Sequence, residues 1–482
     1  MWRFLFVVPL GLLLVAVCSP GAFSEEAAAS SHEQELLEMV KRLEQRVTDL
    51  EAQLRQQQPS AVPAEAAQPA AADATPKAET AAAPAAQTGS NDLQARWKNG
   101  LSFESADKQF RLKLGGRLQA DAAFFDQDED LRWAVGKEQD SAEFRSARIN
   151  LEGQMYGNII YRAEYEFEGD GAGKFRDVYA GITGLPAVGN LKLGHFREPF
   201  GFERLMNPLN TVFMERALPN VFTPDRNIGA MFYDAPLEER MTWAVGVFKE
   251  TDDFPSSNDA DVDQGYTFTG RVTGLPWYKE DGRKLLHLGL AYSHRNPDGA
   301  VPDYRTRPEA HLARRYVNPQ GFPSFRLQDA HVDDVDLLGT EALFLYGPFG
   351  LQGEYIQSYV DTLFAGDLDF GGYYVQANYF LTGEQRQYKT ADGLFGRLIP
   401  KHNFSLGEDG GWGAWELAAR YSAVDVDDGP VRGGTEENLT FGVNWYLNPN
   451  TRIMWNYVHA MIEHDLYEGD LDILQTRVQV DF

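Results

Sequence analysis

Four arginines lie close together in the chain, and their side chains could bind anions. Arg204, Arg216 and Arg226 belong to segment 199–227, and Arg197 stands just before it. A guanidinium group donates planar, charge-assisted hydrogen bonds that match the oxygens of small oxyanions. In a narrow, water-filled passage such donors replace the water that an anion leaves behind. The sequence therefore predicts an anion-binding constriction formed by these arginines.

Each of these arginines also has an acidic neighbour in the chain. A carboxylate beside a guanidinium neutralises its charge, and the pair then fixes a segment in place without attracting an anion. The two roles, anion binding and anchoring of the segment, stay open at the level of the sequence. The acidic neighbours are Glu198, Glu203, Glu215 and Asp225.

Ten further basic residues occupy alternate positions in segments that read as β-strands. In the first of these, Leu112 and Leu114 would face lipid, so Arg111 and Lys113 would face inward. Inward acidic residues are slightly fewer, although the whole chain carries a net charge of −27. A basic lumen favours anions, but any water-filled barrel also carries charges of both signs. The basic residues that we expect to line the lumen are Arg111, Lys113, Arg117, Arg148, Arg162, Lys192, Arg271, Arg420, Arg452 and Arg477.

The elements that must position these residues are amphipathic strands. Over residues 474–482, apolar residues such as Leu474 and Val478 alternate with polar ones. Such a strand needs a neighbour on each edge and lipid on its apolar face. The sequence predicts an all-β fold, a 16-stranded antiparallel transmembrane β-barrel, over residues 100–482. The sixteen predicted strands are 109–125, 142–157, 159–169, 174–185, 189–198, 228–236, 241–251, 265–276, 284–295, 335–347, 349–360, 370–383, 413–424, 437–449, 451–462 and 472–482.

The links between these strands alternate between short and long, as in outer-membrane barrels. Tight turns include 157–158, 347–348 and 448–450, whereas most odd-numbered strands are followed by a longer link. Segment 199–227 is such a link, after the fifth strand. The link 384–412 breaks the alternation, because it is long where a short turn is expected. Either it folds into the mouth of the barrel or the strand count slips there.

The residues before the barrel read as three segments. Arg3, the apolar stretch 4–17 and the small residues at 22–24 predict a secretory signal peptide over residues 1–24. Leucines and valines spaced four and three apart predict a short coiled-coil helix over residues 31–58, with a lone amphipathic helix as the alternative. Alanine and proline dominate residues 59–90, which predicts an extended linker.

Several classes of function find no support in the sequence. Neither Gly-x-Ser-x-Gly nor His-Glu-x-x-His occurs, so we expect neither an enzyme nor a cofactor. Asp259, Asp261 and Asp263 begin like a calcium loop, but Gly265 comes one place late, so we expect no metal site. Cys18 is the single cysteine and lies in the predicted signal peptide, which excludes a thiolate site in the mature chain. The acidic net charge argues against nucleic acid as a partner.

Several stretches of the predicted barrel have distinctive sequences. They are Phe-Arg-Ser-Ala-Arg-Ile-Asn-Leu-Glu-Gly (144–153), Tyr-Arg-Ala-Glu-Tyr-Glu-Phe (161–167), Arg-Asp-Val-Tyr-Ala-Gly (176–181), Leu-Lys-Leu-Gly-His-Phe-Arg-Glu-Pro-Phe-Gly (191–201), Gly-Ala-Trp-Glu-Leu-Ala-Ala-Arg-Tyr-Ser (413–422), Asn-Trp-Tyr-Leu-Asn-Pro (444–449) and Asn-Tyr-Val-His (456–459). These stretches resemble the phosphate-selective porin O and P family. The resemblance covers roughly residues 100–482, and it implies a sixteen-stranded, trimeric outer-membrane channel with an arginine-lined anion path.

The residues and the resemblance together lead us to expect a porin of the bacterial outer membrane. Small anions, with phosphate or polyphosphate as candidates, would diffuse through it passively. The expected partners are outer-membrane lipid, lipopolysaccharide, small anions and the other copies of a homotrimer, with the coiled coil in the periplasm within reach of peptidoglycan. Two alternatives stay open: a non-selective porin, and a structural anchor between the outer membrane and peptidoglycan.

Overall fold

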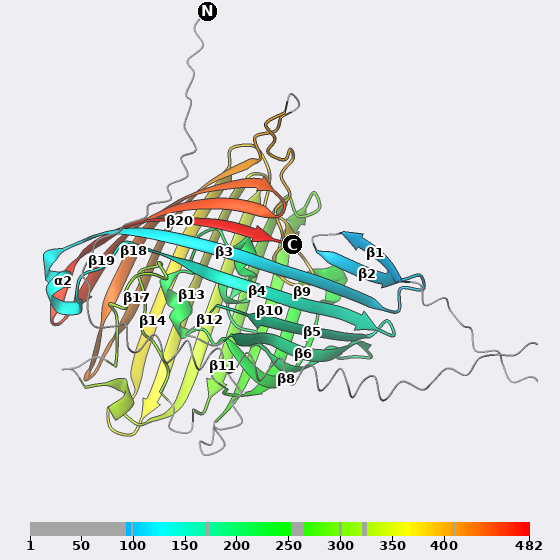
Figure 1. Ribbon diagram of the computed structural model, residues 1–482. Helices are drawn as coiled ribbons and strands as arrows, with labels where there is room; N and C mark the ends of the chain where they lie inside the picture. The colour runs from blue at the N-terminus through cyan, green and yellow to red at the C-terminus, as the bar shows by residue number, and fades with distance from the viewer. Residues whose placement is uncertain are drawn as a thin grey trace, which may run out of the picture. The chain divides into compact units, whose positions relative to one another are not determined.

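The computed structural model describes residues 93–97, 100–168, 173–251, 265–297, 301–320, 325–407 and 410–482. In this part of the chain, sixteen antiparallel strands form a closed β-barrel (Figure 1). The ring closes where β20 (Tyr467–Asp481) pairs with β3 (Arg111–Gln127). The predicted 16-stranded antiparallel barrel is therefore confirmed.

Each predicted strand corresponds to one wall strand, with ends that differ by a few residues. The largest difference is at β18 (Val431–Asn448), which begins before the predicted residue 437. There Val431 pairs with Asp428, so a tight hairpin replaces the expected link. The remaining wall strands are β4 (Ser141–Met155), β5 (Ile159–Glu166), β6 (Lys174–Leu185), β7 (Gly189–Arg197), β8 (Arg226–Asp234), β9 (Met241–Lys249), β10 (Tyr266–Lys279), β11 (Lys284–Arg295), β12 (Val332–Tyr346), β13 (Phe349–Thr362), β14 (Leu368–Phe380), β17 (Ala414–Asp428) and β19 (Thr451–His464).

The wall is apolar outside and polar inside, the reverse of a soluble protein. Leu288, Leu290 and Val478 point outward, and each is about half exposed. Ser358 and Asn438 point inward and are fully buried. An apolar outer surface of this kind is stable in lipid, and the polar inner surface can be satisfied by water or by inserted polar segments. The alternation in the sequence thus has the physical cause that we expected.

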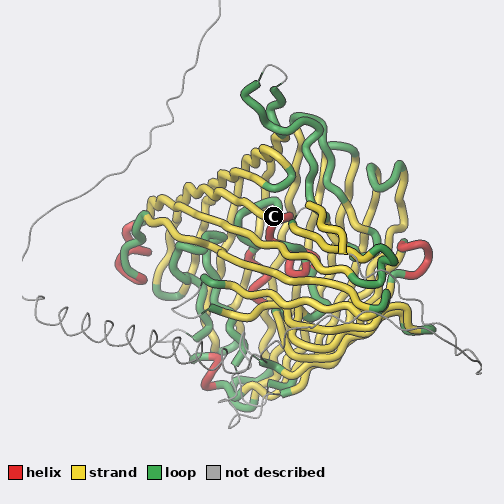
Figure 2. The backbone as a smooth tube through the Cα atoms, turned by 45° about the vertical axis from the view of Figure 1, so that its right-hand side comes forward, coloured by secondary structure: helices red, strands yellow, loops and turns green. Residues whose placement is uncertain are grey.

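Three links fold back into the ring (Figure 2). They join β7 to β8, β11 to β12, and β14 to β17. Phe200 and Val317, from the first two links, pack with Leu337 and Ile356 of the wall in a buried cluster. Phe395, from the third link, packs with inward-facing leucines of β11 and β12. The first part of the link 384–412, up to Leu398, therefore folds into the barrel, in line with the first of the two alternatives, whereas Leu406 and Trp412 are exposed. The strand count does not slip.

Short elements outside the wall were not predicted, because each has too few residues to show a period. The hairpin of β1 (Leu93–Trp97) and β2 (Leu101–Ser105) continues the sheet along the edge of β3 beyond the end of β20. The small hairpin β15 (Tyr388–Lys389) and β16 (Leu394–Phe395) lies in the third inserted link. The short helices are α2 (Glu129–Val135), α3 (Phe202–Leu205), α4 (Pro236–Glu239), η1 (Pro208–Asn210), η2 (Leu218–Phe222) and η3 (Leu327–Asp329).

The predicted signal peptide (1–24), coiled coil (31–58) and linker (59–90) lie outside the described residues and stay predictions. Among the described residues, no helix is both long enough and apolar enough to cross a membrane.

Candidate functional site

The link after β7 is held inside the lumen by two buried carboxylates. Glu354 on β13 accepts hydrogen bonds from the backbone amides of Phe202 and Glu203, at 2.6 and 2.9 Å. The carboxylate of Glu203 in turn accepts bonds from the backbone amide of Ala217 and the side-chain amide of Asn220, each at 2.9 Å. Loss of either acceptor would leave buried donors unsatisfied, so the link has a defined position. Its arginines are therefore presented at fixed places in the lumen.

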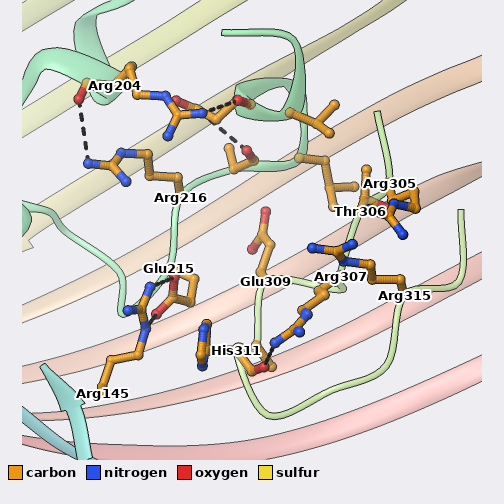
Figure 3. Close-up of a pocket in the computed structure, with 15 residues that line it drawn as sticks. Arg145, Arg204, Glu215, Arg216, Arg305, Thr306, Arg307, Glu309, His311 and Arg315 are labelled. Carbon is orange, nitrogen blue, oxygen red and sulfur yellow. Dashed lines mark hydrogen bonds and ion pairs between the residues drawn. The ribbon is translucent and has the colours of Figure 1, made fainter. Parts of the chain in front are cut away.

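Two of the four predicted constriction arginines, Arg204 and Arg216, face a cavity of about 370 Å³ (Figure 3). Nε of Arg216 donates to the backbone oxygen of Glu203 at 3.0 Å. No carboxylate within the described ranges lies at ion-pair distance from the Arg216 guanidinium. Arg204 donates to Thr223 Oγ1 at 2.5 Å and forms a long ion pair with Asp225 at 3.9 Å. Arg216 thus brings to the cavity a positive charge that no carboxylate of the described residues directly neutralises.

The proximity of the two arginines has an electrostatic consequence for Arg216. Burial, followed by the charge of Arg204, lowers the pKa of Arg216 to about 10. A guanidinium normally titrates above this value, because water and nearby carboxylates stabilise its charged form. An anion bound between the two side chains would stabilise that charge and raise the pKa again.

The link between β11 and β12 forms the opposite side of the same cavity (Figure 3). Arg305 and Arg315 both contact Asp303, at 2.5 and 3.5 Å. Arg307 instead donates to the backbone oxygen of His311, and no carboxylate of the described chain lies within ion-pair distance of it. Arg307 therefore resembles Arg216, because its guanidinium lacks an acidic partner.

Two carboxylates reach this cavity, and both are engaged by arginines. Glu215 contacts Arg145 at 2.8 Å and Arg477 at 2.7 Å. Glu309 contacts Arg420 of the wall. The cavity as a whole therefore has a basic lining. The arginines that line it are Arg145, Arg204, Arg216, Arg305, Arg307 and Arg315.

A second cavity, of about 200 Å³, lies against β3, β4 and β5. Its arginines are closely paired with acidic residues. Arg148 contacts Glu164 and, at 2.7 Å, Glu166, while Arg226 contacts Asp177 at 2.6 Å. This cavity is less basic than the first, because a carboxylate accompanies each of these guanidinium groups. Its arginines are Arg117, Arg148, Arg162, Arg197 and Arg226.

Arg204 and Arg216 therefore line the first cavity and Arg197 and Arg226 the second, while Arg204 and Arg226 also line a further cavity of about 660 Å³ together with Asp225. Asp225 lies 3.2 Å from Arg197, 3.2 Å from Arg226 and 3.9 Å from Arg204. Burial alone would raise the pKa of Asp225, but Arg226 and Arg204 hold it well below its usual range. Asp225 is thus a permanent anion that joins three of the four arginines, and Arg216 is the exception.

Several other predicted lumen residues serve as anchors. Arg271 contacts Glu341 at 2.5 Å, and Arg477 contacts Asp121 at 2.6 Å. Arg420 lies between Glu309 and Glu203, the latter at 3.4 Å, and thereby connects the wall to two inserted links. These residues form ion pairs with carboxylates, which agrees with the alternative of a lumen that carries charges of both signs.

Arg452 and Lys192 have no acidic partner at ion-pair distance among the described residues. Arg452 donates to the backbone oxygen of Thr211 at 2.7 Å and to the Tyr446 hydroxyl at 3.2 Å. Nζ of Lys192 lies 4.6 Å from the ring centre of Tyr179 and 5.2 Å from each of two further rings. Neither side chain lines the first or the second cavity.

Arg111 and Lys113 lie near the start of β3, at the short-turn end of the barrel. They line a cavity of about 540 Å³ together with Arg96 of β1. Lys113 contacts Glu152 at 3.3 Å. The three cavities follow one another along β3 and its neighbour β4. Lys113 lines the one at the short-turn end, Arg117 the second cavity, and Arg145 the first cavity.

The sequence reasoning missed the basic residues Arg145, Arg305, Arg307 and Arg315. Arg145 was missed because it is three residues from the inward-facing Arg148, so strict inward–outward alternation along the strand would put its side chain on the lipid-facing surface. The pairing of β3 with β4 shifts register between Gln119 and Ala120, and the resulting bulge turns Arg145 inward. The other three lie in a link without a regular period, so no sequence signal placed them in the lumen. In the described chain, no three or more His, Cys, Asp or Glu side chains gather in a way that could hold a metal ion.

Comparison with known proteins identifies relatives that extend along the whole barrel. The profile of the family described as phosphate-selective porin O and P matches residues 112–482. Porin O of Pseudomonas aeruginosa is 30% identical over 425 residues, which cover 81% of this chain and 93% of that protein. An uncharacterized protein of Caulobacter vibrioides is 29% identical over an alignment that covers 100% of this chain and 98% of that protein.

Solved structures with a similar fold are more distant. An anion-selective porin from Comamonas acidovorans is 14% identical, with a TM-score of 0.45, and the match covers 77% of this chain and 100% of that chain. OprB of Pseudomonas putida is 10% identical, with a TM-score of 0.46 and coverage of 78% and 95%. Because the sequence identity to these structures is so low, the solutes that those proteins transport give no information about the solute of this protein.

Proposed function

Because the chain belongs to the phosphate-selective porin O and P family, we propose that it is an outer-membrane channel through which small anions, phosphate among them, diffuse passively. The observation that carries the proposal is the basic cavity between the first two inserted links. Arg216 and Arg307 line it from opposite links, and neither has an acidic partner within the described ranges. An anion in this cavity would find guanidinium donors on two sides.

The three basic cavities supply a path for the anion. It enters from the long-loop end, sheds water at Arg204, Arg216 and Arg307, and gains charge-assisted hydrogen bonds in exchange. It then meets the second cavity, where paired arginines hold it less tightly. It leaves past Lys113 and Arg111 at the short-turn end. Transport requires anion binding that is strong enough for entry and weak enough for release. The net positive charge decreases along β3 from the first cavity to the second, which meets this requirement.

Reversal-potential measurements on single channels in planar bilayers test the proposal. In a potassium chloride gradient, we expect a reversal potential close to the chloride equilibrium potential. In a potassium phosphate gradient, we expect the same sign and a smaller conductance, because phosphate binds longer at the guanidinium groups. A reversal potential near zero would favour a non-selective porin, and one near the potassium potential would exclude anion selectivity.

We also propose a homotrimer and a periplasmic coiled coil over residues 31–58. The family resemblance supports the first, and the heptad spacing supports the second. The mass of the detergent-solubilised protein, measured by light scattering, tests the trimer. The same measurement on a chain without residues 31–58 shows whether the coiled coil contributes to assembly. An electrically silent protein whose deletion loosens the envelope would instead support the structural anchor.

A further inference from the structure

A cluster of tyrosine, histidine and aspartate lies on the outer surface of the barrel, near its long-loop end. The hydroxyl of Tyr292 on β11 donates to Asp336 Oδ1 on β12 at 2.7 Å. Nδ1 of His294 lies 2.8 Å from the same oxygen. Nε2 of His294 faces the second carboxylate, Asp334, at 3.9 Å. The imidazole is therefore held by Asp336 on one side, and on the other it faces Asp334, whose Oδ1 also accepts a hydrogen bond from Asn296 Nδ2 at 3.0 Å.

The same cluster recurs six strands further around the wall, on β19 and β20. Tyr457 donates to Asp472 Oδ1 at 2.7 Å, and Nδ1 of His459 lies 2.8 Å from that oxygen. Nε2 of His459 faces Asp470 at 4.0 Å. The pairing register is also the same, since each histidine stands opposite the aspartate that it contacts. Two copies with matching distances in separate strand pairs indicate a specific arrangement.

The arrangement fixes the tautomer of the neutral histidine. An ionised carboxylate only accepts hydrogen bonds, so the nitrogen beside it, Nδ1, carries the proton. Nε2 then presents a lone pair towards the second aspartate. A histidine that binds a metal is commonly oriented in this way, by a carboxylate on its other ring nitrogen. Imidazole nitrogen and carboxylate oxygen together suit zinc and similar ions.

We propose that each cluster binds one divalent transition-metal ion through the histidine Nε2 and the outer aspartate, Asp334 or Asp470. Zinc bonds of about 2 Å in a tetrahedral arrangement place two donors roughly 3.3 Å apart, so each carboxylate must move by roughly 0.6 Å. The side chains can do so, because Asp334 is 33% exposed and Asp470 is 54% exposed. Each cluster offers two donors, and water fills the other positions. These sites are separate from the proposed anion path, because they lie on the outside of the wall.

Chemical modification of the histidines tests this proposal residue by residue. Diethyl pyrocarbonate modifies an unprotonated, unligated imidazole, and mass spectrometry locates the product. At a zinc concentration about ten times the dissociation constant, modification of His294 and His459 is expected to fall about tenfold. The exposed His402, which has no such cluster, serves as the internal control and should react equally with and without zinc.

Matched variants separate the two sites. Asp334→Asn is expected to abolish the protection of His294 by zinc and to leave that of His459 unchanged, and Asp470→Asn should do the reverse. Asp334 is partly exposed and Asp470 is exposed, so the barrel is expected to fold normally in either variant. Three results would each overturn the proposal: no protection by zinc, equal protection at His402, or no modification of His294 and His459 without zinc.

The chain offers a third strand pair for a gain-of-function test. On β17 and β18, Tyr421 donates to Glu437 at 2.7 Å, but Ala423 stands where the other clusters have histidine and Thr435 where they have the outer aspartate. Ala423→His with Thr435→Asp completes the pattern. The introduced histidine is expected to be protected by zinc, whereas Ala423→His alone is expected to give a histidine that zinc does not protect. Equal reactivity of the introduced histidine in both variants would contradict the role of the outer aspartate.

Discussion

The first cavity and the packed side of the lumen use arginine in opposite ways. The first cavity lies beside β4, and the guanidinium groups of Arg216 and Arg307 face it without acidic partners among the described residues. Beside β10 to β18 the lumen is filled by inserted links, with Phe200 and Val317 in an apolar cluster. There the arginines are enclosed by carboxylates, as Arg386 is by Glu416 at 2.6 Å.

Arg216 and Arg420 show what makes the difference. Both contact Glu203, but Arg216 donates to its backbone oxygen and Arg420 to its carboxylate. The side chain of Arg420 is fully buried between two acids. The position of the carboxylates, more than that of the arginines, therefore divides the packed side of the lumen from the first cavity. The predictions below test this division.

The largest effect is expected from Arg420→Ala on the packed side. The change leaves Glu203 and Glu309 buried without their cation, and removing one partner from a buried pair typically costs about 3–5 kcal/mol. Chemical unfolding in lipid or detergent should show this loss of free energy of unfolding. Arg216→Ala, which removes a guanidinium without an acidic partner, is the control and should cost less than about 1 kcal/mol. Equal losses in the two variants would contradict the division.

Arg216→Ala combined with Arg307→Ala is expected to have a smaller energetic effect than Arg420→Ala, but to change anion transport directly. Loss of two charges that no carboxylate balances should lower the ratio of chloride to potassium permeability about five- to tenfold, equivalent to about 1 kcal/mol. Reversal potentials in a potassium chloride gradient measure this ratio. Arg386→Met with Glu416→Gln removes one charge of each sign from the packed side, and it should leave the ratio unchanged.

The smallest effect is expected from pH. The pKa of Arg216, about 10, lies below the usual value, so the side chain loses its proton as pH rises through about 10. Below about pH 10 the buried positive charge of Arg216 lowers the free energy of unfolding. This destabilisation disappears when the guanidinium loses its proton at higher pH. Anion selectivity should fall by less than about twofold between pH 9 and pH 11. Arg216→Ala should show a weaker decline, and an identical decline would exclude Arg216 as the titrating group.

The barrel could be predicted from the sequence because lipid and water impose a period of two on every wall strand. Where a strand departs from this period of two, the inward or outward direction of its side chains was predicted wrongly. The bulge that turns Arg145 inward cannot be read from alternation, since one extra residue reverses the facing of all the residues beyond it. The hairpin β1–β2 has strands of five residues each, too short for a period to stand out.

The anion site could be predicted only in part, for a related reason. Arg204 and Arg216 were found because arginines cluster in one link. Arg305, Arg307 and Arg315 lie in a link that is placed by contacts distant in sequence, such as that between Glu309 and Arg420, which are 111 residues apart. Nothing local in the link indicates that it turns inward. The pairing of each arginine also depends on such distant contacts, so the sequence left the choice between binding and anchoring open.

The seam between β3 and β20 constrains how the protein is made. Gln119 and Gln479, which are joined by a hydrogen bond across this seam, are 360 residues apart. The ribosome must therefore complete nearly the entire wall before its first strand meets its last. Until that moment, both edges of a growing apolar sheet would be exposed to water, a condition that favours aggregation. A chain that stays extended until its last strand is available avoids this exposure, whatever solute the finished pore carries.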